Sequence, residues 1–154
     1  MPAKKLKEYL DSNNIKYLSI KHSAAYTAQE IAAKSHISGK ELAKTVIVRI
    51  NNKIAMAVLP ASYKIDFEAL MEVTGTGNVI LTGEEEFKYM FPDCAIGAMP
   101  PFGNLYDLDV YVAKSLTEDD EISFNAGTHT ELIRMAYKDF ERLVQPKVLA
   151  FSLA

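Results

Sequence analysis

The sequence predicts a single domain of the α/β (α+β) class, in which a mixed β-sheet is flanked by helices. The chain has 154 residues, 49% of them hydrophobic and 24% charged, which suits one domain with a buried core. No repeat, linker or low-complexity tract divides residues 1–154. Strand-like and helical segments follow one another as hairpins and crossovers, without the regular βαβ alternation of a fully parallel sheet.

Helices are expected where apolar residues recur at helical spacing and capping residues stand at the ends. They are residues 3–13, a helix that starts at Thr27 and ends before Ser38, a helix from Phe67 to Gly75 with Asp66 as its cap, a helix after Thr82 that carries Phe87 and Met90, and residues 139–144 with Asp139 as cap. The helices after Thr27 and Thr82 begin with the Thr-x-x-Glu spacing of a capping box, in which hydroxyl and carboxylate each accept a backbone N–H.

Strands are expected in short runs rich in β-branched and aromatic residues. They are residues 15–21, 45–50, 54–59, 79–81, 109–113, 121–125 and 130–136. Residues 45–50 and 54–59 form a hairpin through the polar residues 51–53, and residues 79–81 are expected to be buried. The segment 130–136 alternates like a strand, although Thr128 and Glu131 also have the spacing of a helix start; the strand is favoured.

The charge of the chain argues against a broad nucleic-acid-binding surface. The formal net charge is −3 and the pI about 5.6, whereas such surfaces need many Lys and Arg side chains against phosphates. Contact with RNA is therefore expected to be local. The lysines near the N-terminus are interleaved with Glu8 and Asp11, which indicates a solvated helix face.

The protein is expected to be soluble and cytoplasmic, with no membrane contact. Residues 1–20 carry Lys and Asp rather than an apolar signal-peptide centre, and no run approaches the roughly 18 apolar residues of a membrane span. Cys94 is the only cysteine, which excludes an internal disulfide. CxxC, HExxH, GxSxG, P-loop and GxGxxG motifs are absent from the sequence, so no metal and no cofactor are expected.

Lys44 is the first candidate functional residue. It precedes the apolar run 45–50, so its ammonium is expected to project from the sheet edge toward a phosphate or ester oxygen. Taken alone, a lysine that flanks a strand is more often a solvated terminus.

The loop 97–103 is the second candidate. It contains Gly97, Ala98, Met99, Pro100 and Pro101. The prolines fix φ and remove two hydrogen-bond donors, and the glycine permits close approach of the backbone to a ligand. A rigid connector explains this composition equally well.

The segment 125–129 is the third candidate, because Gly127 is followed by the hydroxyl of Thr128 and the imidazole of His129. His129 is expected to hydrogen-bond substrate or water, although a histidine in a turn is more often structural or exposed. Cys94 lacks a visible base partner, so a small buried residue is favoured over a nucleophile.

These segments, in this order, resemble the YbaK/prolyl-tRNA editing-domain family of trans-acting aminoacyl-tRNA deacylases. The matching pieces are Ala43-Lys44-Thr45-Val46, the GxxxP loop Gly97-Ala98-Met99-Pro100-Pro101, and Phe124-Asn125-Ala126-Gly127 with the downstream DFERLVQP stretch. They extend from about Thr27 to Pro146, which is most of the chain.

The resemblance implies a mixed sheet with flanking helices, a metal-free pocket for the 3′-terminal adenosine and its amino acid, and aminoacyl-tRNA as partner, with a synthetase as a further candidate partner. Lys44 matches the lysine that anchors or orients the tRNA end. The backbone of residues 97–101 would frame the aminoacyl group, and His129 matches a histidine near the pocket of some branches. Ala113 stands where many relatives have an Asp, which puts any role of that carboxylate here in doubt.

The resemblance also suggests the substrate and the chemistry. The loop 97–103 is similar to that of branches that act on alanine or small hydroxylated residues, so a small amino acid, alanine on tRNA(Pro) or a similar small residue, is the expected substrate. Backbone N–H groups of residues 97–103 or 127–129 are expected to stabilise the oxyanion. A non-catalytic tRNA- or nucleotide-binding module and a small-molecule esterase are the competing interpretations.

Overall fold

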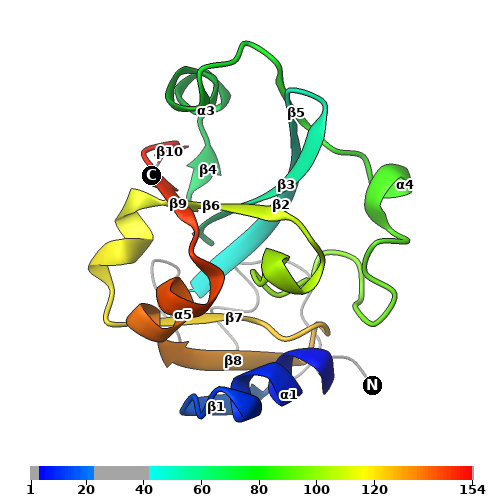
Figure 1. The fold of residues 1–154 in the computed structure, drawn as a ribbon, viewed down its shortest axis with the longest axis vertical. Coiled ribbons are helices and arrows are strands. Elements are labelled where there is room, and N and C mark those ends of the chain that lie inside the picture. Colours follow the sequence, from blue (N-terminus) through cyan, green and yellow to red (C-terminus); the bar gives the residue numbers. More distant parts are fainter. Residues whose placement is uncertain (1–3, 23–41, 154) are drawn as a thin grey trace.

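The structure is a computed structural model that describes residues 4–22 and 42–153 (Figure 1). The helices in these ranges are α1 (Lys4–Ser12), α3 (Phe67–Thr74), α4 (Glu84–Phe87) and α5 (Tyr137–Val144), with 3₁₀ turns at Gly103–Leu105 and Lys114–Glu118. The strands are β1 (Tyr17–Lys21), β2 (Leu42–Ile50), β3 (Lys53–Pro60), β4 (Lys64–Ile65), β5 (Val79–Leu81), β6 (Asp109–Ala113), β7 (Glu121–Asn125), β8 (Glu131–Ala136), β9 (Lys147–Leu149) and β10 (Ser152–Leu153). The helix expected between Thr27 and Ser38 lies outside the described residues.

The main sheet is mixed, as predicted. Its order is β1-β8-β7-β2-β3-β6-β9, with β5 paired to β2 beside this path. Strands β1, β8 and β7 are antiparallel to their neighbours in this group, whereas β7 pairs with β2 in parallel and β6 is parallel to both β3 and β9. The fold is therefore the α+β arrangement expected from the sequence, and the ambiguous segment 130–136 is a strand.

The β2–β3 hairpin is longer than predicted and has a tighter turn. Ile50 pairs with Lys53, which leaves Asn51 and Asn52 as a two-residue turn with φ values of 52° and 68°. Positive φ at both central residues is the type I′ geometry, which matches the twist of antiparallel strands and tolerates Asn.

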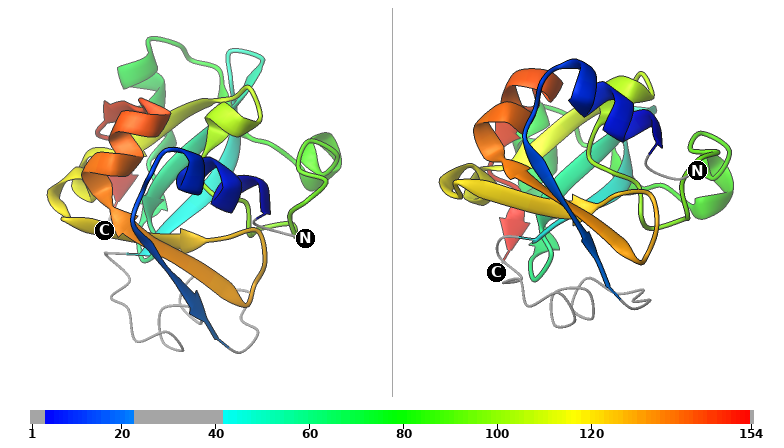
Figure 2. Two further views of the ribbon diagram at one scale, coloured as in Figure 1. Left: turned by 60° about the horizontal axis from the view of Figure 1, so that its bottom comes forward. Right: turned by 90° about the horizontal axis from the view of Figure 1, so that it is seen from below.

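The core has two parts, one on each face of the central strands. Alternate residues of β2 contribute to each, with Ile47 in one part and Val48 in the other. The larger part lies between the sheet and the helices α1 and α5, which pack on the same side (Figure 2). The ring of Phe102 is fully buried at the centre of this larger part. Its centroid lies 6.2 Å from the ring centroid of Tyr9, 5.6 Å from that of Phe124 and 5.5 Å from that of Phe140.

Three expectations about individual elements are wrong. Residues 79–81 do form β5, but Ile80 and Leu81 are 52% and 61% exposed because this short strand pairs only with β2. Thr82 does not cap α4, whose N-cap is Gly83 without a side-chain hydrogen bond. Helix α5 starts at Tyr137, so Asp139 lies in its first turn rather than at its cap.

The cap and end of α3 are confirmed. The Asp66 carboxylate accepts a hydrogen bond from the N–H of Ala69, and Gly75 ends the helix with a φ of 73°. Strand β4 immediately precedes this cap and pairs with β10 near the C-terminus. Strands β4, β9 and β10 were not predicted, because they are too short to show a periodicity.

A glycine directly after Phe102 provides a test of the core. A Cβ atom built on Gly103 would lie 2.6 Å from the carbonyl oxygen of Leu108 and 2.6 Å from a methyl carbon of Val110. We expect Gly103→Ala to lower the free energy of unfolding by about 1–3 kcal/mol, since a backbone oxygen cannot move aside without cost. Urea unfolding of both proteins measures the difference.

Gly77→Ala is the matched control, because no heavy atom lies within 4 Å of a Cβ built on the exposed Gly77. Its free energy of unfolding should equal or slightly exceed that of the wild type. An unchanged unfolding midpoint for Gly103→Ala would contradict the close packing of Gly103 against Leu108 and Val110.

Candidate active site

Two loops that are distant in the sequence are joined by backbone hydrogen bonds. The N–H of Ala95 donates to the carbonyl of Gly127 at 2.8 Å, and the N–H of Gly127 donates to the carbonyl of Ala98 at 2.9 Å. Gly97 and Gly127 have φ values of 86° and 92°, in the left-handed region that favours glycine. The structure therefore brings together the second and third predicted segments, and it explains why each contains a glycine.

His129 closes this junction. Its Nε2 atom lies 3.0 Å from the carbonyl oxygen of Ile96, and because a carbonyl only accepts, Nε2 carries the hydrogen. A Cβ atom on Gly97 would lie 3.6 Å from Cε1 of His129, so the imidazole packs directly against the glycine. The neighbouring Thr128 is half-buried, with its hydroxyl 3.2 Å from that of Thr130. His129 and Gly97 thus form one surface.

Most residues of the loop 97–103 are buried beneath the surface that Gly97 and His129 form. Gly97 is exposed, whereas Ala98, Met99, Pro100 and Pro101 are buried. Met99 belongs to the larger part of the core together with Phe102. Apolar anchoring of the segment after Gly97 fixes the backbone at Gly97 and Ala98, which is the part of the loop that meets His129.

Lys44 lies within the sheet rather than at its edge, contrary to the sequence-based expectation. It is the third residue of β2, which extends to Leu42 because it pairs with β7 on one side and β3 on the other. Ala43 pairs with Phe124, and both belong to the larger part of the core. Since side chains alternate along a strand, Lys44 and Asn125 lie on the opposite face of adjacent strands.

This register relates Lys44 to the joined loops. Strand β7 ends at Asn125 and continues directly into residues 126–129, so Lys44 is on the strand next to the start of that turn. The side-chain oxygen of Asn125 is buried, and none of the described residues forms a hydrogen bond with it. Sequence reasoning did not assign Asn125 a role, although its place at the end of a predicted strand was a usable signal.

The side chain of Lys44 lines a pocket of about 310 Å³. The other lining residues are Val46, Lys64, Ile65, Phe67 and Leu81. Burial lowers the pKa of Lys44, and the positive charge of Lys64 lowers it further. Neither ammonium forms an ion pair with a residue in the described ranges. The pocket therefore combines two unneutralised cations with an apolar wall.

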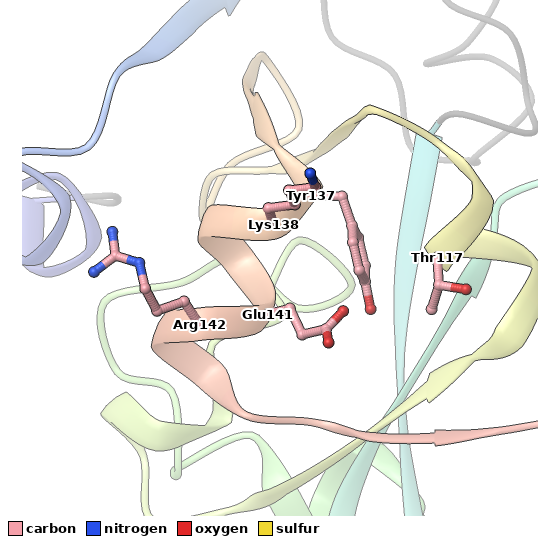
Figure 3. Close-up of a pocket in the computed structure, with 5 residues that line it drawn as sticks. All are labelled: Thr117, Tyr137, Lys138, Glu141 and Arg142. Atoms are coloured by element: carbon pink, nitrogen blue, oxygen red, sulfur yellow. The ribbon is translucent and has the colours of Figure 1, made fainter.

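A second pocket of about 440 Å³ lies elsewhere, against α5 (Figure 3). Its lining residues are Thr117, Tyr137, Lys138, Glu141 and Arg142. The Tyr137 hydroxyl points between Glu141 and Thr117, while Arg142 extends away and pairs with Asp139 at 3.6 Å. Burial, and then Glu141, raises the pKa of Tyr137. None of the predicted site residues lines this pocket.

Cys94 is poorly suited to nucleophilic chemistry. Burial raises the pKa of its thiol to about 11, and the sulfur lies 3.4 Å from the hydroxyl of Tyr106. A thiol with this pKa is protonated at neutral pH, whereas the thiolate is the nucleophile. The preference for a non-catalytic Cys94 therefore has structural support, although the residue is half-buried rather than fully buried.

Neither a metal-binding cluster nor a membrane-spanning helix is found among the described residues. Within residues 4–22 and 42–153, no three His, Cys, Asp or Glu side chains are grouped so that they could hold a metal ion. No helix in those ranges is long and apolar enough to cross a membrane. Ala113, which replaces an Asp expected from the family resemblance, is fully buried between β3 and β9.

Comparison with known proteins agrees with the family resemblance. Residues 22–143 match the aminoacyl-tRNA editing domain. The Multifunctional Ser/Thr-tRNA deacylase ProXp-y of Escherichia coli (strain K12) and that of Escherichia coli O157:H7 are each 29% identical over 127 residues, which cover 77% of this chain and 75% of the relative.

Solved structures share the fold. Hypothetical protein APE2540 superposes with a TM-score of 0.87 at 19% identity, covering 97% of this chain and 100% of that one. A protein proposed to be a trans-editing enzyme for prolyl tRNA synthetase superposes with a TM-score of 0.82 at 20% identity, covering 99% and 97%. The chain therefore belongs to the aminoacyl-tRNA editing-domain family, and it is a hydrolase that acts on aminoacyl-tRNA.

Proposed function

We propose that this editing domain acts in trans in the cytoplasm and removes a small amino acid, alanine on tRNA(Pro) or a serine or threonine, from the 3′ end of a mischarged tRNA. The observation that carries this proposal is the junction of Gly97 and His129 next to the strand of Lys44. Hydroxylated residues are included because the 29% identical relatives are Ser/Thr-tRNA deacylases. Alanine is retained for its similar size.

In the proposed reaction, water adds to the ester carbonyl, the bond to the ribose oxygen breaks, and that oxygen takes up a proton. The positively charged ammonium of Lys44 orients the RNA end by attracting the negative charge of the RNA. His129 donates from Nε2 to Ile96, so its role is to shape the wall around the aminoacyl group. This assignment suits an ester that is already activated and needs positioning more than a strong nucleophile.

Some backbone N–H groups of the two loops are already engaged or missing, which reduces the number of possible donors to the oxyanion. The N–H of Ala98 already donates to Ala95, and that of Gly127 donates to Ala98. Pro100 and Pro101 have no N–H. Residues 98–103 are all buried, whereas Gly97 is exposed and Thr128 and His129 are half-buried. The N–H groups of these three residues are therefore the candidates, and a donor of this kind contributes roughly 2.7–4 kcal/mol in known hydrolases.

Lys44→Ala should lower single-turnover deacylation at least tenfold while the protein remains folded. The reason is that a half-buried lysine without an ion pair in the described part of the chain contributes to substrate orientation more than to stability. Lys53→Ala is the matched control, because Lys53 is exposed at the opposite end of the same hairpin and pairs with Asp109. Equal rates for Lys44→Ala and wild type would remove Lys44 from the site.

A panel of aminoacyl-tRNAs tests the substrate class. We expect overlapping release of alanine, serine and threonine, because one methylene or hydroxyl changes binding by only about 1–3 kcal/mol in a steric pocket. Phenylalanyl-tRNA should be hydrolysed at least 100-fold more slowly, since the backbone behind Gly97 is fixed by buried residues. Efficient release of phenylalanine would contradict the proposed selection, and binding without any release would identify a non-catalytic module.

Catalysis is expected to depend on the ribose hydroxyl next to the ester. Cys94 is protonated at neutral pH and Nε2 of His129 is engaged by Ile96, so neither the thiol nor this nitrogen is placed to activate water. Replacing that hydroxyl by hydrogen in a matched tRNA should lower the single-turnover rate at least 100-fold and leave binding within a few-fold. If both tRNAs react equally fast, the protein itself performs the proton transfer.

A further inference from the structure

The pocket beside Lys44 has features that orientation of a single ester does not require. Its walls come from four separate elements, with Lys44 and Val46 on β2, Lys64 and Ile65 on β4, Phe67 at the start of α3, and Leu81 at the end of β5. Its volume of about 310 Å³ is at the lower end of the range for small-molecule sites. Four elements converging on one cavity indicate a site for a group of defined shape.

The charge in this pocket indicates an anion. Lys44 and Lys64 line the same cavity, and the charge of Lys64 lowers the pKa of Lys44. None of the described residues that line the cavity carries a carboxylate. Two adjacent ammonium groups repel each other unless an anion lies between them. A phosphate would relieve this repulsion, and it would favour the charged form of the partly buried Lys44.

The remaining walls indicate that the anion carries a flat apolar group. Val46, Ile65, Phe67 and Leu81 are apolar, and Leu81 is 61% exposed although it lines the cavity. Aromatic and aliphatic side chains beside lysines are the combination that binds single-stranded nucleic acid, in which bases lie on apolar walls and phosphates meet cations. A nucleotide has both parts in one molecule.

We propose that this pocket is a nucleotide subsite that holds the phosphate on the 5′ side of the terminal adenosine between Lys44 and Lys64, with the penultimate base against Phe67 and Leu81. This inference rests on the proposed function, because it takes the 3′ end of a tRNA as the ligand. It adds Lys64, Phe67 and Leu81 to Lys44 as residues that bind the RNA end.

The dinucleotide cytidylyl-(3′→5′)-adenosine is the probe, because it contains the bridging phosphate and both bases but no aminoacyl ester. Its affinity for the full chain is measured by calorimetry, next to that of adenosine and of inorganic phosphate. Wild type should bind the dinucleotide at least tenfold more tightly than either smaller ligand. Equal affinity for inorganic phosphate would overturn the subsite and leave only a general anion site.

Two variants test the two halves of the pocket. Lys64→Ala should weaken dinucleotide binding about tenfold and reduce the slope of log affinity against log salt concentration by about 0.7, as expected for one lost phosphate contact to a single strand. Leu81→Ala should weaken it about threefold without a change in the slope, and the high exposure of Leu81 means that the fold tolerates this change. Lys53→Ala is the control, with affinity and slope both unchanged.

Kinetics on aminoacyl-tRNA separates this inference from the proposed function. Lys64→Ala should lower kcat/KM about tenfold, mainly through KM, because Lys64 binds the substrate away from the reacting carbonyl. If wild type hydrolyses the ester but Lys64→Ala has the same KM and the same dinucleotide affinity, the subsite is wrong and the function stands. If wild type releases no amino acid from any tRNA, the function is wrong whatever the dinucleotide result.

Discussion

The arrangement of the site depends on a short parallel contact between β2 and β7. Among the described residues, this contact consists of Leu42 paired with Ser123 and Ala43 paired with Phe124. It joins the β1–β8–β7 part of the sheet to the β3–β6–β9 part. It also sets the register of Lys44 relative to the end of β7. Because side chains alternate, a shift by one residue would turn Lys44 into the core and place an apolar side chain at the site. The buried contact between Phe124 and Phe102 opposes such a shift.

In the two joined loops, the backbone itself is held in a fixed conformation. Gly97 and Gly127 supply conformations that other residues rarely adopt, and the buried residues after Gly97 hold the loop against the core. The result is a surface of fixed backbone and one imidazole, without a paired nucleophile and base among the residues that the structure describes. Such a surface suits an activated ester, for which the main requirement is that the carbonyl and the attacking water are held in place.

Sequence reasoning predicted the local features and missed the long-range ones. The strands β6 and β7 and the cap of α3 were predicted correctly, because periodicity and capping act over a few residues. The position of Lys44 in the interior of the sheet depends on pairing with β7, some eighty residues further along the chain, which no local pattern encodes. Lys64 was missed for a related reason, since it lies on a two-residue strand whose partner is β10.

Because the net charge of the chain is −3, binding of a negatively charged RNA end depends strongly on the two cations Lys44 and Lys64. An acidic protein gains little from long-range attraction to RNA, so the affinity for a tRNA end must come from contacts made at short range. In a partly buried pocket the attraction between ammonium and phosphate is screened less by salt than on an open surface. The positive charge of Lys64 lowers the pKa of Lys44, and a phosphate between the two ammonium groups would offset this repulsion. With a phosphate between Lys44 and Lys64, binding requires a phosphate as well as an ester, and a free amino acid ester lacks the phosphate that a tRNA end provides.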